Sequence, residues 1–319
     1  MRNRTSMWFA MLAVSLLAGL AAAEDEGPSP NAPKTGEPPA EVAAVYPGLT
    51  SGILTHARLA KLPPGVLLRS GDVTVTLEEL DKSIREAPER VREQLKRNSL
   101  FLLEQLATSK VLLAAAREVV SEENPDAARL SDNEVVRAWF DKALAGIEVP
   151  DADVSAFYDQ NKSMFGGASL DMVRSSIRQY LLQQKQQEAV TTMIRDLGKS
   201  GTIEVSATWI KEQVPLARDN PVDKARGSGK PTMVDFGRDG CGPCDMMAPI
   251  LKTLKKKYEG KANVLFVHTG EEEILAMRYG IEAIPVQVFF DKDGKEVFRH
   301  TGFFPQDEIE KKLALMGAK

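Results

Sequence analysis

Residues 233–251 read MVDFGRDGCGPCDMMAPIL and contain the only two cysteines of the 319-residue chain, Cys241 and Cys244. A strand-like apolar pattern precedes the cysteines, and an amphipathic helical pattern follows them. A C-x-x-C pair at the junction of a strand and a helix is typical of a redox-active dithiol. The segment therefore predicts both an α/β fold and dithiol redox chemistry for this part of the chain.

The spacing of the two cysteines suits thiol–disulfide exchange. We expect a helix to begin near Gly242, which places Cys241 at its N-terminus, where free N–H groups and the helix dipole stabilise a thiolate. Cys244 lies one turn further along and is near enough to attack a mixed disulfide formed on Cys241. Pro243 occupies the first turn, where its missing N–H loses no hydrogen bond.

A zinc site is the alternative interpretation of the cysteine pair. Two thiolates with His268 or His300 could supply zinc ligands. The sequence has no second C-x-x-C and no paired-histidine motif, so the redox interpretation is favoured and neither a metal nor another cofactor is expected. Two inert core cysteines are a weaker alternative, because the Cys-Gly-Pro-Cys frame is so regular.

The rest of the C-terminal region repeats the alternation of strands and helices. Apolar strand patterns occupy residues 230–237 and 262–269, and residues 285–302 read as two strands joined through a DKDG hairpin. Helical patterns occupy residues 244–260, with an interruption at Pro249, 272–280 and 306–317. The order β-α-β-α-β-β-α, with parallel crossovers first and an antiparallel hairpin last, indicates a layered α/β domain.

The N-terminus has the pattern of a secretory signal peptide. Basic Arg2 and Arg4 precede a short apolar run, and Ala21-Ala22-Ala23 precede Glu24. We expect cleavage after residue 23 and export to the periplasm by a Sec-type route, rather than an uncut membrane anchor. Export agrees with a disulfide-permissive compartment. The formal net charge of −4, with both signs interspersed, gives no indication of a nucleic-acid partner.

Three further regions follow the signal peptide. Residues 24–62 are rich in Pro, Gly and charge at their start and are expected to form a disordered leader. Residues 63–210 contain strand patterns at 65–76 and 202–207 and several helical segments between them. Pro88 is expected to kink or divide the first helix, which follows Thr76, and Gly198 is expected to cap the C-terminal end of the long helix at about 169–197. Capping boxes are expected at Thr76 with Glu79 and at Ser131 with Glu134. Residues 211–319 form the final domain.

The segment 233–251 resembles the active-site segment of thioredoxins, and IPVQVFFDKDGKEVFRHTG at 284–302 resembles their cis-proline strand, hairpin and following glycine. The resemblance covers about residues 219–317. It implies that Cys241 attacks, that Cys244 resolves, and that Asp235 is a buried acid assisting deprotonation of the resolving thiol. It also implies a group of substrate-binding residues: Gly242, Pro243, Ile284, the cis-proline Pro285, and Gly302.

Two departures from the thioredoxin pattern concern the surroundings of the cysteines. Thioredoxins have tryptophans where this chain has Gly237 and Gly240, so an aromatic contact surface is missing. The lysine that usually accompanies the buried acid has no match in NVLFVHT, residues 263–269. Without the resemblance, Asp235 would be interpreted as a strand-edge carboxylate and Pro285 as the first residue of a strand.

The region from about residue 63 to 210 resembles the N-terminal chaperone domain of SurA-like periplasmic proteins. The likeness rests on LLRSGDVTVTLEELDKSI, LLEQLATSKVLLAAARE, VPDADVSAFYDQNKSMF and the long helix IRQYLLQQKQQEAVTTMIRDL with the strand IEV after it. Only GGASLDMV separates YDQNKSMF from the long helix, which leaves no room for a parvulin isomerase domain. A helical spacer or a dimerisation module is the alternative.

The predicted fold class is therefore α + α/β, an all-helical SurA-like domain followed by a thioredoxin-fold α/β domain. The resemblances imply an exported thiol–disulfide oxidoreductase, acting on disulfide-bearing or unfolded client proteins and served by an unidentified redox partner protein. Gly242-Pro243 and Ile284 match the reducing type of this family. The alternative is a periplasmic chaperone or assembly factor that uses the thioredoxin fold as a binding module.

Overall fold

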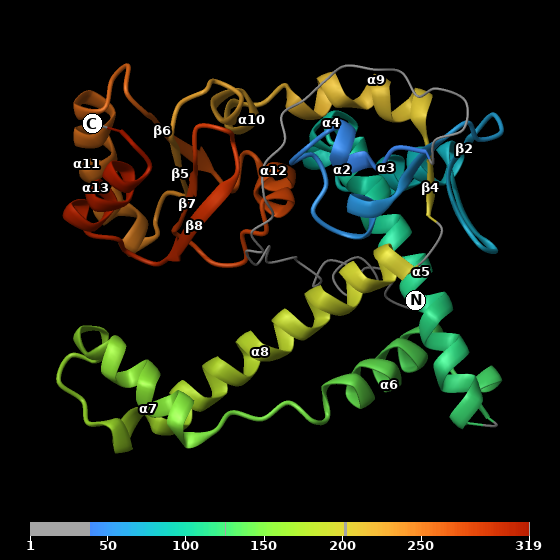
Figure 1. The fold of residues 1–319 in the computed structure, drawn as a ribbon, viewed down its shortest axis with the longest axis horizontal. Coiled ribbons are helices and arrows are strands. Elements are labelled where there is room, and N and C mark those ends of the chain that lie inside the picture. The colour runs from blue at the N-terminus through green and yellow to red at the C-terminus, as the bar shows by residue number, and fades with distance from the viewer. Residues whose placement is uncertain (1–38, 125, 201–202, 319) are drawn as a thin grey trace.

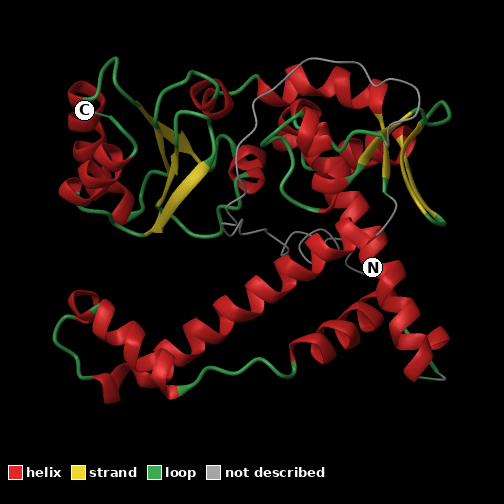
Figure 2. Cartoon of the chain, viewed as in Figure 1, coloured by secondary structure: helices red, strands yellow, loops and turns green. Residues whose placement is uncertain are grey.

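The computed structural model describes residues 39–124, 126–200 and 203–318 (Figure 1). The chain forms a mainly helical N-terminal region and a C-terminal α/β region, each with its own four-stranded sheet (Figure 2). The predicted signal peptide and residues 24–38 of the predicted leader lie outside the described residues.

The N-terminal region contains a small sheet, so the prediction of an all-helical domain is wrong in this respect. Its strands run in the order β1-β4-β2-β3, and β4 is parallel to β1 and antiparallel to β2. The chain thus returns to the first sheet after a long helical excursion, and this pairing could not be derived from the separate strand patterns. The strands are β1 (Arg58–Ala60), β2 (Val66–Ser70), β3 (Val73–Thr76) and β4 (Glu204–Ser206).

The second half of the predicted disordered leader is ordered. Residues 39–62 contain α2 (Val42–Val45), the short 3₁₀ helix η2 (Ile53–His56) and β1. Val42, Ile53 and Leu54 of this segment are fully buried in the helical core. Hydrophobic burial therefore outweighs the turn-forming composition that led to the prediction of disorder.

Buried Glu104 of α5 (Ser99–Glu123) holds the segment around η2 in place through hydrogen bonds. Its carboxylate oxygen Oε1 accepts hydrogen bonds from the backbone N–H groups of Gly52 at 2.9 Å and Leu54 at 3.2 Å. Burial raises the pKa of Glu104, and the backbone donors lower it in part.

Five helical segments follow β3, and local capping chemistry sets several of their ends. Both predicted capping boxes are present, at Thr76 with Glu79 and at Ser131 with Glu134. Pro88 separates the first two helices as predicted. The segments are α3 (Leu77–Glu86), α4 (Glu89–Arg97), α5 (Ser99–Glu123), η3 (Ala127–Arg129) and α6 (Asp132–Leu144).

Helix α5 is the central helix of the N-terminal core, to which it contributes several buried side chains. Among the described residues it is the one helix whose length and apolar composition would also suit a membrane span, and 56% of its most apolar window is buried within the fold. Leu100, Leu103 and Ala107 face the core that the sheet, η2 and helix α9 (Ala207–Arg218) complete. The apolar composition of α5 is accounted for by this packing.

The helices α7 (Asp151–Gln160) and α8 (Leu170–Ser200), with η4 (Lys162–Phe165) between them, form an arm that projects from the helical region (Figure 1). The arm has a small core of its own around Val149, Val154 and Ile177. Gly198 does not cap α8, which continues to Ser200. A Cβ atom at Gly198 would lie 2.8 Å from the carbonyl oxygen of Ile53, so this glycine permits close contact between α8 and η2.

The predicted boundary between residues 210 and 211 falls inside helix α9 (Ala207–Arg218). Trp209, Ile210, Val214 and Ala217 of α9 all belong to the N-terminal core. The N-terminal region therefore extends through α9, and the short helix α10 (Pro221–Arg226) leads into the second sheet.

The C-terminal region has the predicted order of strands and helices. Its sheet runs β6-β5-β7-β8, with β6 parallel and β7 antiparallel to β5, so only the first crossover is parallel. Pro249 lies within a continuous α11 rather than interrupting it. The elements are β5 (Thr232–Gly237), α11 (Gly242–Lys257), β6 (Asn263–His268), α12 (Glu273–Arg278), β7 (Val286–Phe290), β8 (Glu296–Thr301) and α13 (Gln306–Leu315).

Helices cover both faces of this sheet. Met233 and Phe289 pack with Met247 of α11 and Ile309 of α13 on one face. Alternate strand residues point to the opposite face, as the period of two requires, and form a second cluster with α10 and α12. The first of these faces carries the cysteine pair at one end.

Helix α12 connects the two regions. Buried Gln94 of α4 donates to the carbonyl of Glu271 at 2.8 Å and accepts from the N–H of Ile274 at 3.0 Å. The side chain of Ile274 belongs to the N-terminal core. Arg278 donates to the carbonyl of Ala217 at 2.7 Å. These buried polar and apolar contacts fix the α/β region against the helical region.

Candidate active site

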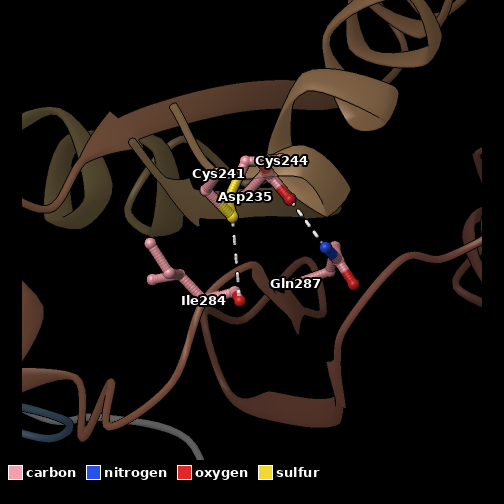
Figure 3. The surroundings of a disulfide bond; sticks show 5 residues. All are labelled: Asp235, Cys241, Cys244, Ile284 and Gln287. Atoms are coloured by element: carbon pink, nitrogen blue, oxygen red, sulfur yellow. Dashed lines mark hydrogen bonds between the residues drawn. A yellow bond between two sulfur atoms is a disulfide. The ribbon is translucent and has the colours of Figure 1, made fainter. Parts of the chain in front are cut away.

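Cys241 and Cys244 are joined by a disulfide at the end of the sheet where β5 stops and α11 begins (Figure 3). Their Cα atoms are 5.2 Å apart, within the usual range for a disulfide. Cys241 is the N-cap residue of α11, in an extended conformation. Gly240, with φ of +73°, makes the turn that brings the chain from the loop after β5 into the helix.

The two cysteine residues differ in their exposure. Cys241 is partly exposed, whereas Cys244 is 6% exposed. After reduction, Cys241 would lie at the positive end of α11, among N–H groups that have no partner within the helix, and these groups favour its thiolate. Gly242 and Pro243 are exposed beside it, and Pro243 lies in the first turn of the helix as predicted.

The peptide bond between Ile284 and Pro285 is cis, and it lies opposite the disulfide (Figure 3). Cys241 Sγ is 4.0 Å from the carbonyl oxygen of Ile284. The carbonyl of Pro285 accepts from the N–H of Gly302 at 2.8 Å, which joins the start of β7 to the end of β8. The structure thus brings Ile284, Pro285 and Gly302 to the same end of the sheet as the cysteines.

Asp235 lies on β5 behind the disulfide and is fully buried. Its Oδ1 accepts a 2.7 Å hydrogen bond from Nε2 of Gln287, which is also fully buried (Figure 3). Burial raises the pKa of Asp235 from 3.8 to about 6, and the hydrogen bond from Gln287 opposes that rise.

Sequence reasoning missed Gln287. The signal was present, because Gln287 is the one polar residue in the otherwise apolar strand VQVFF at 286–290. Its relation to Asp235 follows from the pairing of β7 with β5, where the two residues lie directly opposite each other.

Gly237, at one of the positions where thioredoxins carry tryptophan, leaves room for the disulfide. A Cβ atom there would lie 3.4 Å from Cys244 Sγ and 3.1 Å from the ring of Phe266. Among the described residues, four large apolar side chains in this domain are exposed: Met246, Phe266, Phe303 and, at the end of α13, Leu315. Met246 and Phe303 are close in sequence to Cys244 and Gly302, so apolar surface is available near the disulfide despite the missing tryptophans.

The two histidines named in the zinc alternative have other partners. His268 Nδ1 lies 3.2 Å from the backbone N–H groups of both Gly270 and Glu271. The ring of His300 stacks on Phe304, and its Nε2 lies 3.1 Å from a backbone carbonyl. Within the described ranges, no three side chains are grouped so as to hold a metal ion.

Comparison with known proteins assigns the C-terminal region to a protein family. The profile of a thioredoxin-like domain matches residues 219–317. The thioredoxin of Staphylococcus aureus (strain MW2) is 40% identical over 81 residues, which make up 25% of this chain and 77% of that protein. The chain belongs to the thioredoxin family.

Solved thioredoxin structures also match about a third of the chain. One is a mutant thioredoxin from Halobacterium salinarum NRC-1, with 28% identity over 31% of this chain and 83% of that chain, at a TM-score of 0.28. Another is thioredoxin NaTrxh from Nicotiana alata, with 29% identity over 30% of this chain and 80% of that chain, at a TM-score of 0.27. Residues 219–317 are called the thioredoxin domain below.

Proposed function

We propose that this protein is an exported thiol–disulfide oxidoreductase that acts on protein disulfides through Cys241 and Cys244. One observation carries the proposal: the pair closes a disulfide at the N-terminus of α11, directly opposite the cis Ile284–Pro285 bond. Membership of the thioredoxin family supports the general reaction class.

The reduced protein would transfer two electrons to a client disulfide. The Cys241 thiolate attacks one client sulfur, forms a mixed disulfide and releases the other client sulfur as a thiolate, which takes a proton from water. Cys244 then loses its proton, attacks Cys241 Sγ and releases the second client thiol. The products are a reduced client and the Cys241–Cys244 disulfide that the structure contains.

The client would meet the exposed side of this site. An extended client segment would lie along the start of β7 at Pro285. Gly302 leaves the approach open, because no atom of the described residues lies within 4 Å of a Cβ built there. Gly242, Pro243 and Ile284 would complete the contact surface around Cys241. The Gly-Pro pair and Ile284 support a reducing role, near −270 mV for thioredoxin itself as against about −120 mV for strong oxidants.

The helical region is proposed to hold unfolded clients. Its likeness to SurA-like chaperone domains supports this role, as does the return of β4 to the first sheet after α8. In the view of Figure 1 the arm of α7 and α8 extends below the thioredoxin domain, on the side toward which β8 runs, and the disulfide lies at that same end of the sheet.

Export, and with it a periplasmic location, is supported by the three-part pattern of residues 1–23. A reductant in an oxidising compartment needs an electron donor, so a redox partner protein belongs to the proposal. Intact-mass measurement of exported protein tests the location, with a chain beginning at Glu24 as the expected result and retention of residues 1–23 as the contrary one.

Reduction of insulin by dithiothreitol tests the activity. Wild-type protein should accelerate it well above the rate with dithiothreitol alone, and a variant with Cys241→Ser and Cys244→Ser should not. Equal rates for the two proteins would leave the thioredoxin domain as a binding module.

The double-serine variant also tests the helical region. It should still slow the aggregation of a reduced, unfolded client, because client binding does not need the cysteines. If it has no effect at several-fold molar excess, the helical region is a spacer or a dimerisation module.

A further inference from the structure

A row of polar side chains crosses the sheet of the thioredoxin domain behind the disulfide. Asp235 of β5 lies opposite Gln287 of β7, and Gln287 lies opposite His300 of β8. Residues that are directly opposite in antiparallel strands share a face of the sheet. This is the face on which α11 packs, so the buried end of the row lies beneath the cysteine pair.

The inner pair of this row has two buried oxygen atoms that no described residue contacts through a hydrogen bond. Gln287 Nε2 donates to Asp235 Oδ1, whereas Asp235 Oδ2 and Gln287 Oε1 have no hydrogen-bond partner among the residues that the structure describes. A buried polar group left unpaired costs about 1–3 kcal/mol. An apolar pair would fit the neighbouring strand residues better for stability alone, which indicates that the two polar groups serve the reaction.

We propose that Gln287 is a positioning residue that orients Asp235 as the proton acceptor for Cys244. This inference rests on the proposed oxidoreductase function. Through Nε2 the amide donates to the ionised carboxylate, and after rotation about its last bond it accepts through Oε1 from the protonated acid. A neutral amide therefore supports both protonation states of Asp235 without adding a charge to the buried site.

The proton moves during resolution of the mixed disulfide. Cys244 S–H gives its proton to the free Oδ2 of Asp235, and the resulting thiolate attacks Cys241 Sγ. The bond between Cys241 and the client sulfur breaks, and the client leaves as a thiolate. Protonated Asp235 then returns its proton to the leaving thiolate or to water, so that charge and protons balance over the step.

Other titratable groups lie on the elements that surround Asp235. On the same face, β6 carries His268 and β8 carries His300, and α11 carries the two cysteines and exposed Asp245. Helix α13 also packs on this face, and its Lys312 lies over the ring of Phe298. Among the described residues, only Gln287 is hydrogen-bonded to the Asp235 carboxyl group. Burial and this one hydrogen bond act on its pKa in opposite directions.

The substitutions Gln287→Met and Gln287→Lys should therefore shift the pH dependence in opposite directions. Methionine has a similar length but no donor, so the pKa of Asp235 rises further. Lysine places a positive charge beside the carboxylate, so that pKa falls. Loss of packing would instead lower the rate at every pH without moving the profile.

The experiment is single-turnover reduction of a fluorescent disulfide peptide by full-length protein, pre-reduced and freed of reductant, from about pH 5.5 to about pH 8.5. We expect Gln287→Met to move the acidic limb of the rate profile to higher pH, with a several-fold loss near pH 6 that largely disappears near pH 8. Gln287→Lys should move the limb to lower pH.

The Asp235→Asn background provides the control. There the acidic limb due to Asp235 is absent, and adding Gln287→Met should change the profile no further. If Gln287→Lys does not fold, the pair of Met variants with and without Asp235→Asn decides the question.

Two results would overturn the inference in distinguishable ways. If wild type is active but Gln287→Met leaves the limb in place, or shifts it equally in the Asp235→Asn background, Gln287 does not position Asp235 although the oxidoreductase function stands. If wild type reduces the peptide no faster than the double-serine variant, the proposed function and this inference fail together.

Discussion

Replacing Asp235 with asparagine should stabilise the protein at neutral pH and not at acidic pH. The pKa of Asp235 is raised from 3.8 to about 6 because its carboxyl group is buried. The folded state therefore holds this proton more tightly than the unfolded state does. Stability from the protonated acid is fully present below pH 3.8 and is lost as the pH rises through about 6.

The size of the effect follows from the shift. A rise from 3.8 to about 6 is about two pH units, and each unit corresponds to about 1.4 kcal/mol. Ionised Asp235 thus lowers the free energy of unfolding by about 3 kcal/mol at neutral pH. Asparagine cannot ionise, so the difference in stability between the variant and wild type should change by about 3 kcal/mol between pH 3.5 and pH 7.5.

Urea unfolding of the oxidised full-length proteins at a series of pH values measures this difference. Any constant effect of the amide on packing cancels when the two pH values are compared, and other titrating groups are common to both proteins. A difference that is the same at both ends of the pH range would refute the assignment of Asp235 as a buried, ionising carboxylate.

Two predictions concern the N-terminal region. Gly198→Ala should lower the free energy of unfolding by about 1–3 kcal/mol, because the added Cβ would lie 2.8 Å from the backbone oxygen of Ile53. Thermal unfolding measures this loss. The control Gly146→Ala should show no such loss, because no atom of the described residues lies within 4 Å of its added Cβ. Glu104→Ala should destabilise the region by about 2–5 kcal/mol, because two backbone N–H groups lose their buried acceptor. Hydrogen exchange should then be faster in residues 50–57 than in wild type, and unchanged exchange there would contradict the role given to this carboxylate.

The thioredoxin domain was predictable because its decisive features are local in sequence. The strand before Cys241, the helix after it and the hairpin at residues 291–294 each follow from short patterns, and the observed order of elements confirms them. Gln287 was not predictable from such patterns, because its role arises from the register between β5 and β7. The role of a single polar residue in an apolar strand can be inferred only when its neighbour on the adjacent strand is known.

The errors in the N-terminal region have a similar origin. Turn-forming residues lie between Val42 and the pair Ile53-Leu54, so the segment looked disordered although all three side chains are fully buried. Gly198 looked like a helix end because the partner that demands a glycine, η2, lies far away in sequence. In each case a contact that forms only in the folded chain outweighs local composition.

Trapping of a mixed disulfide tests the central claim most directly. In the variant Cys244→Ser, the reduced protein should attack a client disulfide and remain joined to it through Cys241, because no resolving thiol is present. Non-reducing electrophoresis should show a high-mass band that dithiothreitol removes, and mass spectrometry should place the client on Cys241. The variant Cys241→Ser should give no such band. If the band forms with Cys241→Ser and not with Cys244→Ser, the roles of the two cysteines are reversed, and if neither variant captures a client, the disulfide of this thioredoxin domain is not an exchange site.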